Sequence, residues 1–474
     1  MANEMLNNRI FDRRELPMVR IIDALCGAGK TSYVINEINS NDTPVVYCTE
    51  SRDEADRIGL ACDKVISLGF GEHENDDDYV TEYKEKYGVE ELPTFEGTYG
   101  IRLDKEGNIE RKSKTDIFIE LLEKGESIAI THKLLREFNE ECYRLIKKNG
   151  YRLYLDEVFN TVDIISSSPH DIEILFNEGL TKLIPETNEV VWAKDDYTGD
   201  FDKKKKAIQS GDVYLAELSD RKQLLVCEMS ICKFIYFTDV TITTYQFVGS
   251  QLSRFFDINK VPYTVYSMKD HSIVPYDIHT EDRESIRKLI NLYDGSINYN
   301  INGTLSYSCY EKLRKNNKKL INDANKKKKK KDEDKISSVL DPVLKKIKAN
   351  ADNYFKNIVK AKNDTIMWSC YKDDLEFLKG RKCTSKSHVT YNIRATNKYR
   401  NKTNLAYLVN PNVKPDVRNY FAAHDANISE DLYALSTLLQ WIFRSALRDG
   451  KPVNLYLPSE RMRDLLDKWM NYEI

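Results

Sequence analysis

The stretch MVRIIDALCGAGKTSYVI, residues 18–35, joins an apolar run to a glycine-rich turn and then to a helical pattern. The apolar run at 18–24 predicts a buried strand. Glycines allow backbone N–H groups to turn toward a polyphosphate, and a helix N-terminus adds its positive end. The sequence therefore predicts a phosphate-binding loop. Its expected nucleotide-binding residues are Gly27, Ala28, Gly29, Lys30, Thr31 and Ser32.

Two side chains of this loop carry specific expectations. Lys30 would reach the β- and γ-phosphates, and the Thr31 hydroxyl would ligate Mg²⁺. Ala24 stands where the general GxxxxGK[ST] pattern has its first glycine, so the match is incomplete. An ordinary strand-to-helix turn is the alternative, and the strand in front with the helix behind disfavours it.

A second signal is a pair of acids at the end of another apolar run, YRLYLDE at 151–157. Asp156 would hold the Mg²⁺ shell through water, and Glu157 would orient and deprotonate the attacking water. Adjacent acids at the end of a strand are also common as helix N-terminal charges. Their combination with Lys30 favours the catalytic interpretation.

Around these signals, short apolar runs alternate with helical patterns. Strands are expected at 18–24, 44–49, 127–132, 151–157, 233–238 and 240–245, and helices at 51–61, 115–124 and 133–147. The alternation predicts an α/β fold with a doubly wound, mostly parallel sheet. The C-terminal half repeats the pattern, so we expect two domains, 1–255 and 256–474.

The charge distribution marks the expected insertions. Residues 301–350 hold 15 Lys or Arg against 6 Asp or Glu, and we expect a Lys-rich insertion at about 301–360. Within it, 322–335 has no apolar periodicity and predicts a solvated linker or hairpin tip, with a polyanion-binding tail as the alternative. A second insertion is expected at about 165–225.

Composition excludes several classes of protein. The chain has 474 residues, a hydrophobic fraction of 41% and a formal charge of −3, which indicate a globular protein without a global attraction for polyanions. Its nine cysteines include no CxxC pair and no zinc-site spacing, which favours a reducing compartment. Without an apolar leader or spanning stretch, we expect a cytoplasmic protein and no membrane partner.

The motifs together resemble those of superfamily 2 helicases, in the manner of small bacteriophage-encoded helicases. Residues 24–31 and Asp156-Glu157 are similar to the Walker A and Walker B motifs. The runs at 45–58 and 127–135 resemble elements that touch the nucleic-acid backbone, 240–247 resembles motif III, and 437–448 resembles motif VI. Val158-Phe159 after the acids makes this neither a DEAD nor a DEAH box by letter, and motif III begins 84 residues after Glu157.

The resemblance implies two RecA-like domains that bind ATP and Mg²⁺ and move along or unwind DNA, single-stranded or branched, rather than RNA. Replication or recombination proteins would be its partners, in a host cytoplasm if the protein is viral. It also implies roles for residues in the matching motifs. Thr49, Thr131 and His132 would contact nucleic acid, and Thr241 and Thr243 would couple hydrolysis to the bound strand. Gln440, Arg444 and Arg448 would be catalytic, with Arg444 as the arginine finger.

Two other functions stay open from the sequence. A viral DNA-packaging ATPase shares the phosphate loop, the Asp-Glu strand end and a threonine-rich segment. Packaging motors usually append a nuclease with clustered acids, and the C-terminal half offers Gln440 and Arg444 instead. A non-hydrolysing, nucleotide-gated nucleic-acid-binding protein is the other alternative, and the presence of Lys30, Thr31 and Glu157 argues against it.

Overall fold

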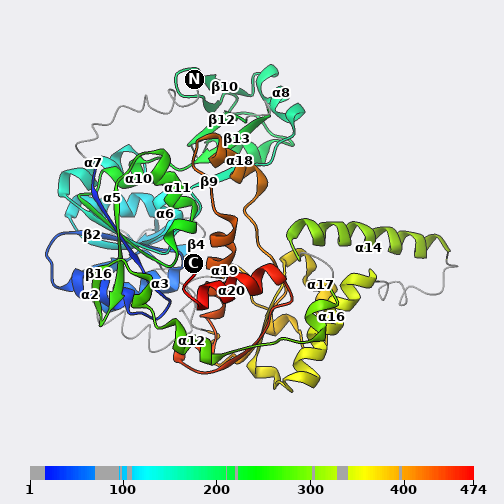
Figure 1. Cartoon of the computed structure of the whole chain (residues 1–474). Coiled ribbons are helices and arrows are strands. Elements are labelled where there is room, and N and C mark those ends of the chain that lie inside the picture. The colour runs from blue at the N-terminus through cyan, green and yellow to red at the C-terminus, as the bar shows by residue number, and fades with distance from the viewer. Residues whose placement is uncertain are drawn as a thin grey trace. The chain divides into compact units, whose positions relative to one another are not determined.

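The computed structural model describes residues 16–69, 95–96, 99–103, 109–209, 211–218, 222–301, 305–327, 340–393 and 398–474. The chain forms two compact units, Met1–Asp277 with Lys414–Ile428, and Ile278–Val413 with Ser429–Ile474 (Figure 1). We expected the division after residue 255. It falls later because β15 (Tyr263–Lys269) pairs in parallel with β1 (Met18–Asp23) and so belongs to the first sheet.

The first unit is built on an eight-stranded sheet in the order β16-β15-β1-β14-β8-β2-β7-β3. The remaining strands are β2 (Val45–Thr49), β3 (Val65–Ser67), β7 (Ser127–Thr131), β8 (Arg152–Asp156), β14 (Asp239–Thr244) and β16 (Ser272–Pro275). All neighbouring pairs are parallel except β15 with β16. The predicted α/β class with a mostly parallel sheet is confirmed.

Helices cover both faces of this sheet, with α5 and α7 on one face and α2 and α3 on the other (Figure 1). The helices of the unit are α2 (Lys30–Asn39), α3 (Arg52–Ala61), α5 (Lys114–Lys124), α6 (His132–Arg136), α7 (Glu140–Asn149), α10 (Cys232–Ile235) and α11 (Gln251–Ile258). Along β2, Val46 and Cys48 pack on one core, and Val45 and Tyr47 pack on the other. Successive side chains of a strand point to opposite faces, so a doubly covered strand is apolar throughout.

A separate five-stranded antiparallel sheet lies in the chain between β8 and β14. It consists of β9 (Val162–Ile165), β10 (Thr181–Ile184), β11 (Glu189–Trp192), β12 (Val213–Glu217) and β13 (Gln223–Glu228), with α8 (Pro169–Asn177) and α9 (Asp202–Gln209). Helix α18 (Pro415–Ala423) is attached to it, since the Tyr420 hydroxyl donates to Glu228 over 2.7 Å. This sheet accounts for the long interval between Glu157 and Thr241. A small sheet of β4 (Phe95–Glu96), β5 (Tyr99–Leu103) and β6 (Ile109–Ser113) precedes α5.

The second unit has a four-stranded, fully parallel sheet in the order β17-β20-β19-β18. Its strands are β17 (Ile290–Leu292), β18 (Ile366–Ser369), β19 (Asn404–Tyr407) and β20 (Val453–Tyr456). Its helices are α12 (Arg283–Leu289), α13 (Ser296–Tyr299), α14 (Tyr307–Lys327), α16 (Pro342–Asn353), α17 (Leu375–Leu378), α19 (Glu430–Ile442) and α20 (Glu460–Met470). Trp368, Trp441 and Trp469 are fully buried in its core.

Three local predictions were wrong. The run at 233–238 is not a strand but the helix α10 followed by a turn, in which Phe234 packs into the core. Residues 133–147 form two helices, because the Asn139 side chain accepts from the backbone N–H of Cys142 and caps a new one. Helix α14 extends to Lys327, so 322–327 is not a linker. Most of the Lys326–Lys331 run lies outside the described residues. No helix among the described residues is long and apolar enough to cross a membrane.

A network of four charges ties α2 to three strands of the first sheet. Glu37 on α2 accepts from Arg20 on β1 over 2.9 Å and from Arg152 on β8 over 2.7 Å. Asp239 on β14 lies 3.7 and 3.5 Å from the same two guanidinium groups. Burial raises the pKa of Glu37, but the hydrogen bonds from the two arginines outweigh it and hold the pKa below its usual value.

We predict that Glu37→Gln lowers the free energy of unfolding by about 1–3 kcal/mol, because two partly buried guanidinium groups lose their shared partner. A carboxyl whose folded pKa is depressed stabilises the fold above its unfolded pKa, and this is lost as the pH falls through the folded pKa. Urea unfolding from pH 7 to pH 3 should therefore show a steeper acid loss for the parent chain than for Glu37→Gln. Asp42→Asn, which removes the exposed partner of Lys64, is the control and should change nothing measurable. Parallel acid profiles for the parent and Glu37→Gln would contradict the prediction.

Candidate functional site

The phosphate loop forms at the carboxyl end of β1, as the sequence predicts. Gly27 and Gly29 have φ of 93° and 89°, in the left-handed region that glycine adopts without a steric penalty. Gly29 is the N-cap of α2, which begins at Lys30. The loop therefore presents a helix N-terminus behind two freely turned peptide groups, as an anion-binding site requires.

The Lys30 side chain folds over the loop that precedes it. Its ammonium donates to the carbonyls of Ala24 and Leu25, the latter over 3.0 Å, and the residue is only 8% exposed. The charge is thus held beside the turn and the first peptide groups of α2. This is the position from which a lysine contacts a bound polyphosphate as a point charge.

A residue that the sequence analysis missed lies against the loop. The hairpin of β15 and β16 turns through Asp270 and His271, both with positive φ, as in a type I′ turn. A Cβ placed on Gly29 would stand 3.2 Å from His271 Nδ1, so the ring lies directly over the loop backbone. The two-residue turn between alternating strands was the available signal, but nothing local to His271 indicated its distant neighbour.

Asp156 ends β8, two strands away from β1, with β14 between them. Its Oδ1 accepts from the Thr243 hydroxyl over 2.8 Å. Burial, together with the neighbouring charges of Glu157 and Glu54, raises the pKa of Asp156 to about 7, and Thr243 and Lys30 pull it down. The phosphate loop and the carboxylate thus stand on strands separated by β14, from which Thr243 donates to the carboxylate.

Glu157 follows in a left-handed conformation, with φ of 63°. Such a backbone costs a non-glycine residue on the order of 1–3 kcal/mol and is concentrated at functional sites. It is held by a hydrogen bond from its N–H to the Thr243 carbonyl, 2.8 Å, while its carboxylate accepts from Thr244 over 3.2 Å. Because of this turn the two successive carboxylates accept from different residues, Asp156 from Thr243 and Glu157 from Thr244.

The two predicted coupling threonines therefore differ. Thr243 pairs with Asp156 in the register of β14 and β8 and donates to it. Thr241 lies one pleat earlier, is 1% exposed, and its hydroxyl has no hydrogen-bond partner among the described residues. Only Thr243 contacts the candidate site directly.

The three predicted nucleic-acid contacts also separate. Thr49 is fully buried, and the Nε2–H of His132 donates to the Asp156 carbonyl over 3.0 Å while its ring packs on Phe159. Thr131 is partly exposed and precedes α6 without capping it. The structure thus gives Thr49 and His132 places in the packing behind the acids, and leaves Thr131 accessible.

The motif VI candidates belong to the second unit. Gln440 lies in the last turn of α19, Arg444 just after the helix ends at Ile442, and Arg448 in a short 3₁₀ helix at Ala446–Asp449. Gly450 closes that 3₁₀ helix. Arg444 is 6% exposed, and its Nε has no hydrogen-bond partner among the described residues. A buried guanidinium without a carboxylate is costly unless an anion completes it.

The donor set at the first unit fits Mg²⁺. Among the described residues no group of three or more His, Cys, Asp or Glu side chains forms a metal cluster. Mg²⁺ is usually bound by one or two protein oxygens together with substrate phosphates and water. The Thr31 hydroxyl at the start of α2 and the Asp156 carboxylate are oxygens of this kind.

Comparisons with known proteins find similarity both in sequence and in structure. Residues 284–470 match the family described as the YonV C-terminal Rossmann-like domain. The chain is 28% identical over 469 residues to the SPbeta prophage-derived uncharacterized protein YonV of Bacillus subtilis (strain 168), covering 95% of this chain and 98% of that protein. A solved structure named "XPD_APO" is similar with a TM-score of 0.43 and 11% identity, over 97% of this chain and 96% of that one.

The two β14 threonines give a test of the site geometry. Thr243→Val should lower the free energy of unfolding by about 1.5–3 kcal/mol, because it removes a hydrogen bond to a buried carboxylate. Thr241→Val, its matched control on the same strand, should be neutral or stabilising, since its hydroxyl is buried without a partner. Unfolding in guanidinium chloride measures the free energy of unfolding of both variants. An equal decrease in the two would contradict the hydrogen bond from Thr243 to Asp156.

Proposed function

We propose that this protein is a nucleic-acid-dependent ATPase that translocates along or unwinds DNA. The observation that carries the proposal is that Lys30, Asp156 and Glu157 lie at the carboxyl edge of one parallel sheet, with both acids bonded to Thr243 on the strand between β1 and β8. In open α/β sheets this edge is where ligands bind. A phosphate loop, a metal-side carboxylate and an adjacent acid form the combination needed for hydrolysis of a nucleoside triphosphate.

Each group has a distinct task in this reaction. The loop N–H groups and Lys30 would bind and orient the β- and γ-phosphates. Thr31 and Asp156 would hold Mg²⁺, which would supply positive charge against the phosphates. Glu157 orients a water in line with the γ-phosphate and accepts its proton at a carboxylate oxygen. The products are the diphosphate and inorganic phosphate, with the water oxygen transferred to phosphorus.

Arg444 is the proposed arginine finger from the second unit. Its burial, with an Nε that has no hydrogen-bond partner in the part of the chain that the structure describes, supports a role toward an anionic group. A guanidinium placed against the γ-phosphate neutralises charge that spreads over the transferred group.

The prophage-derived relative supports a bacteriophage origin and, with it, a place in the host cytoplasm. Replication or recombination proteins are the partners that we propose. DNA, single-stranded or branched, is the proposed polymer, and ATP with Mg²⁺ the proposed cofactors. A packaging ATPase and a nucleotide-gated binding protein without hydrolysis are the outcomes that the following tests separate.

We predict that Lys30→Ala and Glu157→Gln each lower ATPase turnover by a factor on the order of 10² or more, because each removes a group that acts on the transferred phosphate. Circular dichroism should be unchanged in both. Lys30→Ala should also weaken nucleotide binding, whereas Glu157→Gln should retain it. Turnover is measured with single-stranded DNA, duplex DNA and RNA in parallel. Parent turnover in Glu157→Gln, or no stimulation by any polymer, would contradict the proposal.

Arg444 gives an independent test. Arg444→Ala should lower polymer-stimulated turnover by a factor on the order of 10³ without weakening ATP binding to the same degree, since an arginine finger acts in the transition state. Arg444→Lys should not restore it, because an ammonium lacks the planar fork of a guanidinium. Lys451→Ala, an exposed cation on the same unit, is the control. Equal effects of Arg444→Ala and Lys451→Ala would exclude the finger.

A further inference from the structure

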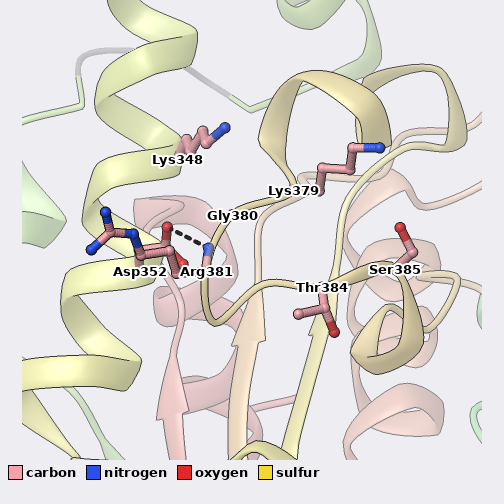
Figure 2. A pocket seen from close by; sticks show the side chains of 7 residues that line it. All are labelled: Lys348, Asp352, Lys379, Gly380, Arg381, Thr384 and Ser385. Atoms are coloured by element: carbon pink, nitrogen blue, oxygen red, sulfur yellow. Dashed lines mark hydrogen bonds between the residues drawn. The ribbon is translucent and has the colours of Figure 1, made fainter.

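The second unit has an open pocket of about 640 Å³ beside the segment that enters β18 (Figure 2). Lys348 and Asp352 line it from successive turns of α16. The facing segment 379–385 contributes Lys379, Arg381, Thr384 and Ser385, together with the Gly380 backbone. The pocket includes none of the motif VI residues Gln440, Arg444 and Arg448.

The wall of the pocket is fixed by Asp352. Its carboxylate accepts from the backbone N–H groups of Arg381 (3.1 Å), Lys382 (2.8 Å) and Cys383 (3.3 Å). A Cβ on Gly380 would stand 2.2 Å from Asp352 Oδ2, so this close approach of turn and helix requires glycine. Three N–H donors satisfy the Asp352 charge internally, and the turn holds its neighbouring cations at the rim of the pocket.

The surroundings are strongly basic. Residues 342–362 and 379–390 contain ten Lys or Arg against one acid, Asp352. Among the described residues, neither Lys348 nor Arg381 forms an ion pair, and Lys379 pairs with Glu376 only at an exposed position. An exposed pair of this kind contributes little and exchanges readily for another anion. The whole chain carries −3, so this concentration of positive charge is local.

The lining also selects among anionic ligands. Lysine, arginine, serine and threonine side chains, with backbone N–H groups, are the donors that bind phosphate oxygens of a nucleic acid. No aromatic side chain lines the pocket, so it offers no stacking platform for a base. Figure 2 shows cations on both walls of the pocket, with Lys348 and the Arg381 guanidinium on the side of α16 and Lys379 on the other.

We propose that this pocket binds the sugar–phosphate backbone of a nucleic acid, independently of base sequence. The inference rests on the proposed function for the relevance of a polymer, and it adds a contact surface that none of the predicted nucleic-acid residues supplies. Lys382 is a positioning residue here. Its ammonium donates to the Ala361 carbonyl and the Asn363 side chain, which fastens the 380–383 turn to the segment before β18.

The test compares two triple variants with the same change of charge. Lys348→Gln, Lys379→Gln and Arg381→Gln are combined in one chain. Lys372→Gln, Lys451→Gln and Lys468→Gln, exposed on the same unit outside the pocket, are combined in the control. Fluorescence anisotropy of a labelled 20-nucleotide single-stranded DNA is recorded between 50 and 200 mM NaCl, with duplex DNA and RNA of the same length in parallel.

Each lost phosphate contact reduces the slope of log K against log salt by about 0.7 for a single strand, so three lost contacts reduce it by about 2. In the pocket triple we expect the slope to fall by this amount and the affinity at 50 mM NaCl to fall at least tenfold. In the control triple we expect the slope to fall by less than a third of this amount. Equal slopes in the two triples would overturn the proposal. Complete competition by millimolar inorganic phosphate would overturn it as well, since the pocket would then bind a free anion.

Single Lys348→Gln and Arg381→Gln chains, each expected to reduce the slope by about 0.7, keep the test valid if the triple is poorly folded. ATPase turnover without polymer should be the same in the parent and in every pocket variant. If the parent hydrolyses ATP but the pocket triple binds DNA as tightly as the parent does, this inference fails and the proposed function stands. If the pocket triple binds DNA more weakly but the parent shows no ATPase turnover, the proposed ATPase fails and this inference stands.

Discussion

The candidate site depends on the position of β14 between β1 and β8. Asp23, the last residue of β1, accepts from the backbone N–H groups of Gln246 and Phe247 over 2.7 and 2.8 Å, which fastens the turn after β14 to the phosphate-loop strand. On the other side, Thr243 accepts the N–H of Glu157 and donates to Asp156. The phosphate loop and the two acids are thus both positioned by β14 and the turn that follows it. Without it, the loop and the acids would have no fixed separation.

The parts of the fold that the sequence predicts well are those in which local pattern and tertiary role agree. The strand at 18–23, the turn through Gly27 and Gly29, and the apolar run before Asp156 are each specified within about ten residues. Strand order is different, because β14 pairs with β1 and β8 from a distant part of the chain. An interval of 84 residues indicated an insertion, but nothing in it specified an antiparallel sheet or the attachment of α18.

The errors have equally physical causes. The run at 233–238 is apolar enough for a buried strand, but a short apolar run is equally compatible with a short helix, and here the helix buries Phe234. Thr49 and His132 follow apolar strands, where an open α/β sheet places its ligand crevice. Both residues are buried and His132 donates to the Asp156 carbonyl, so their contact with nucleic acid stays a prediction. The position of His271 over Gly29 arises from a hairpin turn that pattern alone cannot connect to the loop.

Several groups at the carboxyl edge of the first sheet are unfavourable for the stability of the fold. A left-handed Glu157, two successive acids, a raised Asp156 pKa and a lysine turned onto carbonyls of its own loop all oppose stability or contribute little to it. Elsewhere in the unit opposite charges pair, as Glu37 does with two arginines. Costs that are concentrated at one edge, and that a bound cation and polyphosphate would offset, couple ligand affinity to the stability of the whole sheet. That coupling is a stronger physical reason to assign a ligand to this edge than any single motif, because it explains why Asp156 and Glu157 are tolerated side by side.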